Sequence, residues 1–365
     1  MSIQVTVTRI PLDPPAAHAL SRFEYRDYAL IQITSDEGLE GFSYCIGDRY
    51  VALSVRELAR VVLGRDPIEI AAIWDDLYHA VRPLGRRGAA MVALSALDNA
   101  LWDLRAKAVG LPLYRLLGAR TDVVPAYASS GVYADGATLG DLREEYAGLA
   151  AAGFSSFKMR IGRLSLQDDV ARVHAVRETI GSNAQLAVDA NTSWRSVGEA
   201  MRFVDAVKEY NIDWIEEPFH PEALGNYQAL AARTTIPISL GEQESGRWQF
   251  ATMIQSGAIS ILQPDVTVIG GVSEWLRVAS TGATFSLAVM PHYFPPLHVH
   301  LACACPGVER VEYVPLHKLV NADLLFIDPP MPHEGFISPP DAPGFGLTLN
   351  PEAVERYRLD SVRID

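Results

Sequence analysis

Seven short apolar runs recur after Val123, and their spacing constrains the fold more than any other feature of the chain. The runs are SSFKMR, QLAVDAN, DWIEEP, PISLGEQ, SILQPD, SLAVMPH and RVEYVP. Each contains or ends in one prominent polar residue, and successive polar residues lie 20 to 31 positions apart. Segments of helical pattern follow the runs. A strand–helix unit of a parallel barrel takes roughly 25 to 30 residues, so the spacing predicts a β/α barrel.

The polar residues of these runs should meet. Side chains at the C-terminal ends of barrel strands converge on one mouth, where such barrels carry their chemistry. The seven are Lys158, Asp189, Glu216, Glu242, Asp265, His292 and Glu312. We therefore expect one cleft that holds a mixed set of acids, a lysine and a histidine.

The rest of the chain predicts an appended domain. Residues 1–121 read as an α+β domain, with YALIQITSDEGLEGFSYC as a hairpin and a helical pattern from about 51 to 117. We assign residues 122–328 to the barrel. The segment 329–365 is rich in Pro and Gly at its start and reads as ordered loop that packs back on the first domain.

Composition narrows the class of protein. The chain has 365 residues, of which 49% are apolar and 21% charged, and this is typical of globular domains. A formal net charge of −13 disfavours nucleic-acid and acidic-membrane partners, and no spanning segment is predicted. The start lacks a signal-peptide pattern, and Cys45, Cys303 and Cys305 form no disulfide framework. We expect a cytoplasmic protein.

Asp189, Glu216 and Glu242 end three consecutive predicted strands. Three carboxylates in one mouth repel each other unless a cation lies among them. Oxygen ligands without Cys or His favour Mg²⁺, which also retains positions for substrate oxygens. The alternative is that these acids are only solvated side chains, and their even spacing argues against it.

Asp265 and His292 end the next two strands, where a hydrogen bond between neighbours is feasible. A carboxylate fixes the tautomer of an imidazole and raises its proton affinity, which makes a general base or acid. Lys158 and Arg160 lie two residues apart in one strand and so share a face. Both should point into the barrel, where they oppose the acids and can stabilise an enediolate made from a substrate carboxylate.

The ordered motifs resemble the enolase superfamily, specifically its mandelate racemase branch. They are SALDNALWDLRAKAVGLPLYRLLGA, FKMRIG, VDANTSW, WIEEPF, ISLGEQ, LQPDVTVIGGV, MPHYF and VEY, and they span nearly the whole chain. The resemblance implies a modified TIM barrel, (β/α)7β, under an N-terminal α+β capping domain that the C-terminal tail completes. It also implies one Mg²⁺ per subunit, a small-molecule carboxylate substrate and a homo-oligomer.

The resemblance also implies residue roles. Asp189, Glu216 and Glu242 match the metal ligands, and Asp265 and His292 match a catalytic pair. Glu312 matches an acid that hydrogen-bonds a substrate carboxylate. Asn191 matches a residue beside the first metal ligand, and we group Asn191 with the substrate-binding residues. Two loops of the cap are expected to set substrate choice, with Arg22, Arg49 and Tyr50 as polar candidates.

One position departs from the branch, and it shapes the predicted reaction. The strand motif commonly carries two lysines, the second a base opposite the histidine, whereas this chain has Lys158 and then Arg160. Arginine stays protonated and is a poor base. Racemisation needs a proton-transfer group on each face of the carbanion, but elimination of a β-hydroxyl can run on His292 alone. We predict dehydration of an aldonic or aldaric acid to a 2-keto-3-deoxy acid.

Other interpretations remain open at this point. Lys158 could act as a second base, which would give a racemase or epimerase, or as a Schiff-base amine of a different lyase class. A binding protein without activity would require one of the seven groups to be broken, and none is. His292, His298 and His300 could be interpreted as a zinc cluster, but a packed helix better explains their spacing.

Overall fold

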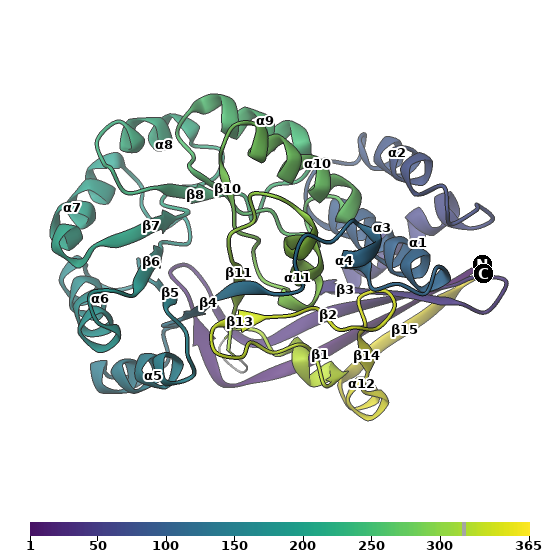
Figure 1. Ribbon diagram of the computed structural model, residues 1–365, viewed down its shortest axis with the longest axis horizontal. Coiled ribbons are helices and arrows are strands. Elements are labelled where there is room, and N and C mark those ends of the chain that lie inside the picture. The colour runs from purple at the N-terminus through teal and green to yellow at the C-terminus, as the bar shows by residue number, and fades with distance from the viewer. Residues whose placement is uncertain (316–318) are drawn as a thin grey trace.

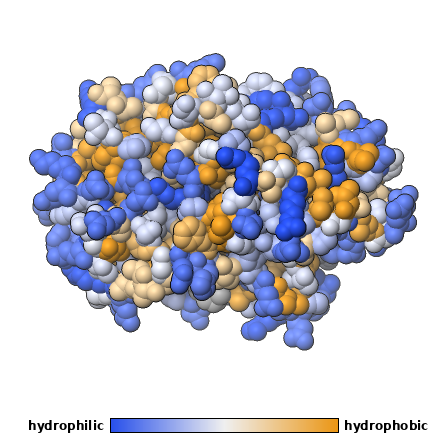
Figure 2. Space-filling view, in the orientation of Figure 1, coloured by the Kyte–Doolittle hydropathy of each residue, from blue (hydrophilic) through white to orange (hydrophobic). Residues whose placement is uncertain are grey.

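The structure, a computed structural model, describes residues 1–315 and 319–365. A parallel barrel with its ring of helices occupies one side of the molecule and an α+β cap the other (Figure 1). On the face drawn in Figure 2, hydrophilic side chains are interrupted by several apolar patches. Among the described residues, none of the helices is both long and apolar enough to span a bilayer.

The barrel confirms the predicted fold class. Its strands are β4 (Val124–Ser130), β5 (Ser156–Arg160), β6 (Gln185–Asp189), β7 (Ile212–Glu216), β8 (Ile238–Leu240), β9 (Ile261–Leu262), β10 (Ala288–Val289) and β11 (Val311–Tyr313). The helices between them are α5 (Leu139–Ala151), α6 (Leu166–Ile180), α7 (Val197–Val207) with the 3₁₀ turn η1 (Lys208–Tyr210), α8 (Leu224–Ala231), α9 (Arg247–Ser256), α10 (Gly271–Thr284) and α11 (Pro295–Ala304). Within the described residues this is a (β/α)7β order.

Neighbouring barrel strands pair in parallel, in the order β10, β9, β8, β7, β6, β5, β4, β11. The ring closes between β10 and the residues before β11, where Val289 N donates to Gly307 O at 2.9 Å. The seven predicted runs are therefore β5 to β11. The first strand, β4, has two serines at its end and no charged residue, which is why the polar pattern did not include it.

The side chains of β5 alternate between the apolar core and the barrel interior, as predicted. Phe157 and Met159 pack in the apolar layer between the strands and the surrounding helices, whereas Lys158 and Arg160 lie among the acids. Successive residues of a strand point to opposite faces, so one five-residue strand supplies both core and site. Below the site the barrel interior is filled by Tyr127, Ala187, Trp214, Ile261 and Met290.

The cap consists of an antiparallel sheet and four helices. Its elements are β1 (Ser2–Ala17), β2 (Arg22–Thr34), β3 (Glu40–Ile46), α1 (Arg49–Val62), α2 (Ile70–Val81), α3 (Ala89–Ala108) and α4 (Leu113–Leu116). Leu94, Leu97, Leu101 and Leu104 of α3 are all buried in the cap core, as the sequence pattern predicts.

Helix α3 also joins the cap to the barrel. Asp98 accepts hydrogen bonds from the backbone N and Oγ of Ser273, at 2.9 and 2.6 Å, and so caps the start of α10. Asn99 accepts from Val272 N at 2.9 Å. Gly271, at φ +77°, permits this approach, because a Cβ there would lie 2.4 Å from Asp98 Oδ2. The cap is thereby fixed against one end of the barrel.

The C-terminal tail differs from the predicted ordered loop. Residues 329–365 contain β13 (Phe336–Ile337), β14 (Thr348–Leu349), α12 (Pro351–Tyr357) and β15 (Arg358–Ile364), and they follow η2 (Ala322–Leu325) and β12 (Phe326–Ile327) at the end of the segment assigned to the barrel. Strand β15 pairs with β1, so the two termini lie side by side at the edge of the cap (Figure 1). Strand β13 instead pairs with β4 of the barrel. Most side chains of β15 are exposed, so this edge strand lacks the apolar alternation that predicts strands.

Candidate active site

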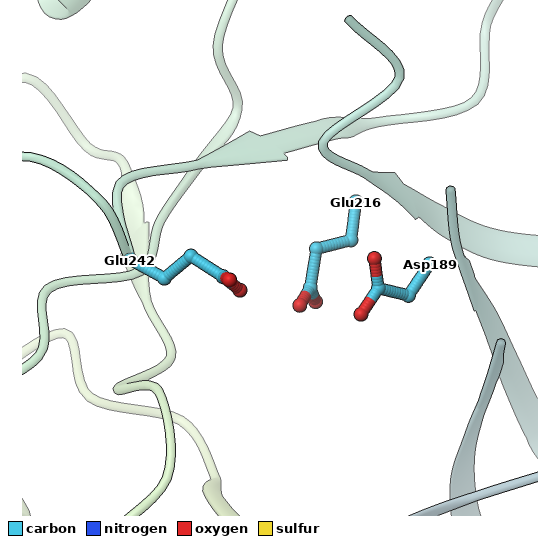
Figure 3. A group of neighbouring side chains, drawn as sticks. All are labelled: Asp189, Glu216 and Glu242. Atoms are coloured by element: carbon cyan, nitrogen blue, oxygen red, sulfur yellow. The ribbon is translucent and has the colours of Figure 1, made fainter. Parts of the chain in front are cut away.

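Three carboxylates converge at the mouth of the barrel. Asp189 and Glu216 end the adjacent strands β6 and β7, and Glu242 follows β8 by two residues. One oxygen of each lies within 4.8 Å of the others. Figure 3 shows Glu242 reaching from the opposite side toward the paired carboxylates of Asp189 and Glu216. Among the described residues this is the one group of three or more potential ligands that could hold a metal ion.

The chemistry of this group fits a hard divalent cation. Burial raises the pKa of Glu242 well above its usual range, and the nearby negative charge of Glu217 adds to the effect. Burial likewise raises the pKa of Glu216, although Lys158 opposes the shift. Such acids gain most from a cation placed among them. All the converging ligand atoms are oxygens, as Mg²⁺ prefers.

A histidine–aspartate pair faces this group from β9 and β10. His292 Nδ1 lies 2.9 Å from Asp265 Oδ2, and its Nε2 lies 3.4 Å from Glu242 Oε2. The other oxygen of Asp265 accepts from the backbone N and Oγ1 of Thr267, both at 2.7 Å. The imidazole is therefore held by Nδ1, with Nε2 directed toward the acids.

Electrostatics favour the charged form of this histidine. Burial alone would lower the pKa of His292, but the carboxylates of Glu242, Asp265 and Glu312 outweigh it and raise the pKa to about 9. The side chain is 15% exposed, whereas that of Asp265 is 3% exposed. His292 is thus a partly accessible titratable group with a buried anion behind it.

Two cations lie on the other side of the acids. Lys158 donates to Glu216 and forms an ion pair with Glu312 at 2.9 Å. Arg160 Nε lies 3.4 Å from Asp189 Oδ2, and its Nη1 donates to Ser129 Oγ. Burial opposes the charge of Lys158, yet Glu216 and Glu312 raise its pKa well above the usual value. Both side chains remain cationic.

Glu312 joins the two sides. Although burial would raise its pKa, Lys158, His292 and Arg160 hold the pKa of this carboxyl below its usual range. Its Oε2 also accepts from Tyr293 N at 2.9 Å. All seven polar residues of the predicted strand ends therefore lie in one connected cluster. The side chains of Lys158 and Glu216 are fully buried within it.

The structure places the remaining candidates at different distances from this cluster. The backbone N of Asn191 donates to Asp189 Oδ1 at 2.8 Å, and its side-chain oxygen is buried without a partner among the described residues. Arg22 forms an exposed ion pair with Asp135. Arg49 and Tyr50 contact each other and line a surface pocket of the cap, apart from the seven residues.

Sequence reasoning missed several residues that support the acids. Gln263 Nε2 donates to Glu216 Oε2 at 2.5 Å. Gln243 donates to both oxygens of Glu217, at 2.8 and 3.0 Å, directly behind two of the candidate ligands. Gln263 lies two residues before Asp265, and this spacing was the signal that could have revealed it.

Histidines 298 and 300 do not join a metal cluster. Both lie in α11, fully buried, and burial lowers the pKa of each to about 4. Each ring is hydrogen-bonded to backbone atoms. The packed helix, preferred over a zinc cluster on the sequence, is what the structure contains.

Comparison with known proteins agrees with this geometry. Residues 1–118 match the mandelate racemase/muconate lactonizing enzyme N-terminal domain, and residues 141–353 match the enolase C-terminal domain-like family. The chain therefore belongs to the mandelate racemase/muconate lactonizing enzyme family of the enolase superfamily.

Relatives of this chain carry several activities. It is 33% identical to the D-galactarolactone cycloisomerase of Agrobacterium fabrum, over 95% of this chain and 96% of that protein. It is also 33% identical to the L-talarate/galactarate dehydratase of Salmonella typhimurium, over 89% of this chain and 81% of that protein. A racemase from Streptomyces coelicolor, solved with bound magnesium, has a TM-score of 0.91 and 29% identity, covering 98% of this chain and 99% of the racemase.

Proposed function

We propose that this protein is a Mg²⁺-dependent acid-sugar dehydratase. It removes the proton next to the carboxylate of an aldonic or aldaric acid and expels the β-hydroxyl, which yields a 2-keto-3-deoxy acid. The observation that carries the proposal is the asymmetry of the site. His292 faces the three acids from one side, and a permanently charged arginine, Arg160, lies on the other.

Asp189, Glu216 and Glu242 would hold the metal. Their three converging oxygens support this assignment, as does the magnesium bound in the Streptomyces coelicolor racemase. Bound there, Mg²⁺ would draw negative charge onto the substrate carboxylate and so acidify the neighbouring C–H bond.

His292 is proposed to move the proton. In its neutral form Nε2 accepts the α-proton, while Asp265 stabilises the imidazolium through Nδ1. The C–H electron pair passes into the enediolate and then expels the β-hydroxyl. The leaving oxygen takes the proton from His292 and departs as water. The resulting enol tautomerises to the 2-keto acid, so one residue serves as base and then as acid.

Lys158 and Arg160 are proposed to stabilise the enediolate. Their charges face the region where the substrate carboxylate gains negative charge during proton removal. A substrate carboxylate would compete with Glu312 for these cations. That competition would favour the protonated form of Glu312, which can donate a hydrogen bond to the substrate oxygen.

A racemase or epimerase remains the second candidate from the sequence, with Lys158 as the other base. Ion pairs of the Lys158 amine with Glu216 and Glu312 support dehydration instead, because they engage the group that would have to act as a free base. The raised pKa of Lys158 weighs against a Schiff-base lyase, which needs a lowered lysine pKa. Lysine 158 is thus proposed as an electrostatic group.

A cycloisomerase is a further candidate, favoured by the identity to the Agrobacterium fabrum enzyme. Abstraction of the α-proton would be the shared first step. The two reactions would differ in the group that leaves the β-carbon, which is a hydroxyl in an open acid and a ring oxygen in a lactone. A single base on one face would serve either reaction.

The deciding experiment is a substrate screen. The enzyme with Mg²⁺ is incubated in D₂O with a stereochemically complete set of aldonic and aldaric acids and their lactones. Dehydration predicts a 2-keto-3-deoxy product from open acids, detected by carbonyl derivatisation and by ¹H NMR, and no product with His292→Asn. Deuterium exchange or inversion without a 2-keto product would overturn the proposal. Turnover of lactones alone would select the cycloisomerase.

We also infer a cytoplasmic homo-oligomer with the domain limits predicted from the sequence. Three free cysteines support a reducing compartment. Exposed apolar residues of the cap that line one pocket, such as Ile68 and Val109, support an assembly surface. Light scattering coupled to size exclusion measures the subunit number.

Arg22, Arg49 and Tyr50 remain predicted substrate-selecting residues. Alanine variants of these residues, tested in the same substrate screen, would check this prediction.

A further inference from the structure

His298 occupies a position that the reaction as described does not use. It lies in α11, its side chain is fully buried, and its two ring nitrogens contact two separate backbone segments. Nε2 lies 3.0 Å from Val266 N, and Nδ1 lies 2.6 Å from Tyr293 O. A backbone N–H can only donate, so Nε2 accepts and carries no proton. The proton of the neutral ring is therefore on Nδ1, which donates to the carbonyl.

The two partners of His298 directly follow the two members of the histidine–aspartate pair. Val266 comes after Asp265, beyond β9, and Tyr293 comes after His292, beyond β10. One buried ring thus connects the two backbone segments that carry the pair. The Asp265–His292 hydrogen bond spans the same two segments on the side of the site. A change in the spacing of the segments would change this hydrogen bond.

The segment after His292 has a strained backbone. Tyr293 and Phe294 have φ of +51° and +44°, in the left-handed region that residues with a Cβ rarely adopt. Such residues cost about 1–3 kcal/mol each and persist only where the surroundings fix them. Glu312 accepts from Tyr293 N at 2.9 Å, and His298 binds the carbonyl of the same residue. Without His298, one of these two hydrogen bonds to the backbone of Tyr293 would be lost.

From this arrangement we infer that His298 is a positioning residue, which holds the segments bearing Asp265 and His292 at the separation and orientation that proton abstraction requires. The effect on turnover rests on the proposed function, whereas the effect on the hydrogen bond does not. A displacement of about 1 Å in a reacting group can reduce the rate about 100-fold.

His300 offers a matched control on the same helix. It is also fully buried and also makes two backbone contacts, but these are with Tyr114 N at 3.3 Å and Phe345 O at 3.1 Å. Its partners belong to α4 of the cap and to the tail. Replacement of either histidine by leucine leaves buried backbone groups unpaired, so both variants should lose thermal stability. Only the change at position 298 should alter the pair.

The first test is kinetic and uses His298→Leu, His298→Asn, His298→Gln and His300→Leu with Mg²⁺, well below each melting temperature. We expect His298→Leu to lower kcat and α-proton exchange about 10- to 100-fold. KM and Mn²⁺ affinity should stay within about twofold, because no ligand or cation is touched. Glutamine, which carries an acceptor and a donor on one amide, should restore most of the rate, and asparagine less. His300→Leu should keep the wild-type kcat.

The second test needs no substrate and therefore separates this inference from the proposed function. In metal-free protein with ¹⁵N-labelled histidine, the Nδ1 proton of His292 should give a strongly downfield signal that reports its hydrogen bond to Asp265. We expect this signal to be lost or shifted in His298→Leu and retained in His300→Leu. If both leucine variants, folded, kept it unchanged, the inference would be wrong even where turnover fell. If His298→Leu does not fold, the Nδ1 proton signal of His292 is compared between His298→Gln and His298→Asn instead, and that comparison decides.

Discussion

The two sides of the acidic cluster are built from different kinds of interaction. On the β5 side, Lys158 and Arg160 are cations held by ion pairs with the acids. On the β9–β10 side, His292 is a titratable group held by Asp265 and by a frame of backbone hydrogen bonds. We propose that the first side stabilises charge and that the second accepts and returns a proton, and this difference predicts chemistry from a single face.

The largest expected effect comes from removing the proton acceptor. His292→Asn should lower α-proton exchange and product formation about 10⁴-fold, the upper range for general acid–base catalysis. Its Mn²⁺ affinity should be unchanged, because the three carboxylates remain. The measurements are ¹H NMR exchange in D₂O and calorimetric titration with Mn²⁺. Substantial residual exchange in this variant would place a second base on the β5 side.

Loss of a metal ligand should separate metal binding from proton transfer. Glu216→Gln should weaken Mn²⁺ binding by about 100-fold or more, since even groups that only support ligands contribute 10- to 100-fold. Asp265→Asn is the matched control, as another buried carboxylate of the mouth outside the acidic group. Asp265→Asn should bind Mn²⁺ normally, while its rate of α-proton exchange should fall. Equal Mn²⁺ affinity in wild type and Glu216→Gln would contradict the assignment.

Arg160→Lys tests the asymmetry from the other direction. Lysine cannot reproduce the two-sided contact with Asp189 and Ser129, so dehydration should fall about tenfold. A lysine can lose its proton, however, and detectable inversion at the α-carbon should appear. Chiral chromatography of recovered substrate measures it. If wild type and variant inverted the centre equally, Arg160 would not be what prevents racemisation.

The smallest expected effect is a shift in titration. In metal-free protein, NMR should give His292 a pKa of about 9, and Glu242→Gln should lower it toward 6.5 because the carboxylate that raises this pKa most is removed. The folded protein binds this proton more tightly than the unfolded chain does. The group therefore stabilises the fold fully below about pH 6.5, and that contribution is lost as pH rises through about 9. In Glu242→Gln the free energy of unfolding should fall less as the pH rises between about 6.5 and 9, as measured by urea unfolding at a series of pH values.

Much of the site was predictable because barrel geometry converts spacing into proximity. Residues as distant in sequence as Lys158 and Glu312 lie in contact because the side chain of each points into the barrel from its strand. The period of two along β5 correctly placed both cations inside the barrel. These inferences need only the order of elements and the direction of side chains, which local patterns encode.

Other features depended on packing that local patterns do not encode. The serine end of β4 has no charge, so nothing in the sequence marked Ser129 as a partner of Arg160. Strand β15 forms because β1 offers an edge, although its own residues are mostly exposed. The position of Arg49 depends on how α1 begins, and a loop of polar residues does not specify this. His298 looked like a buried core residue, and only its two partners indicate more.

The central claim is that one base, His292, acts on one face of the substrate. The most direct measurement follows the stereochemistry of deuterium at the α-carbon of substrate recovered from partial turnover in D₂O with Mg²⁺. The account predicts that any incorporated deuterium retains the original configuration and that His292→Asn incorporates none. Inverted, deuterated substrate from wild type, or exchange that persists in His292→Asn, would contradict it.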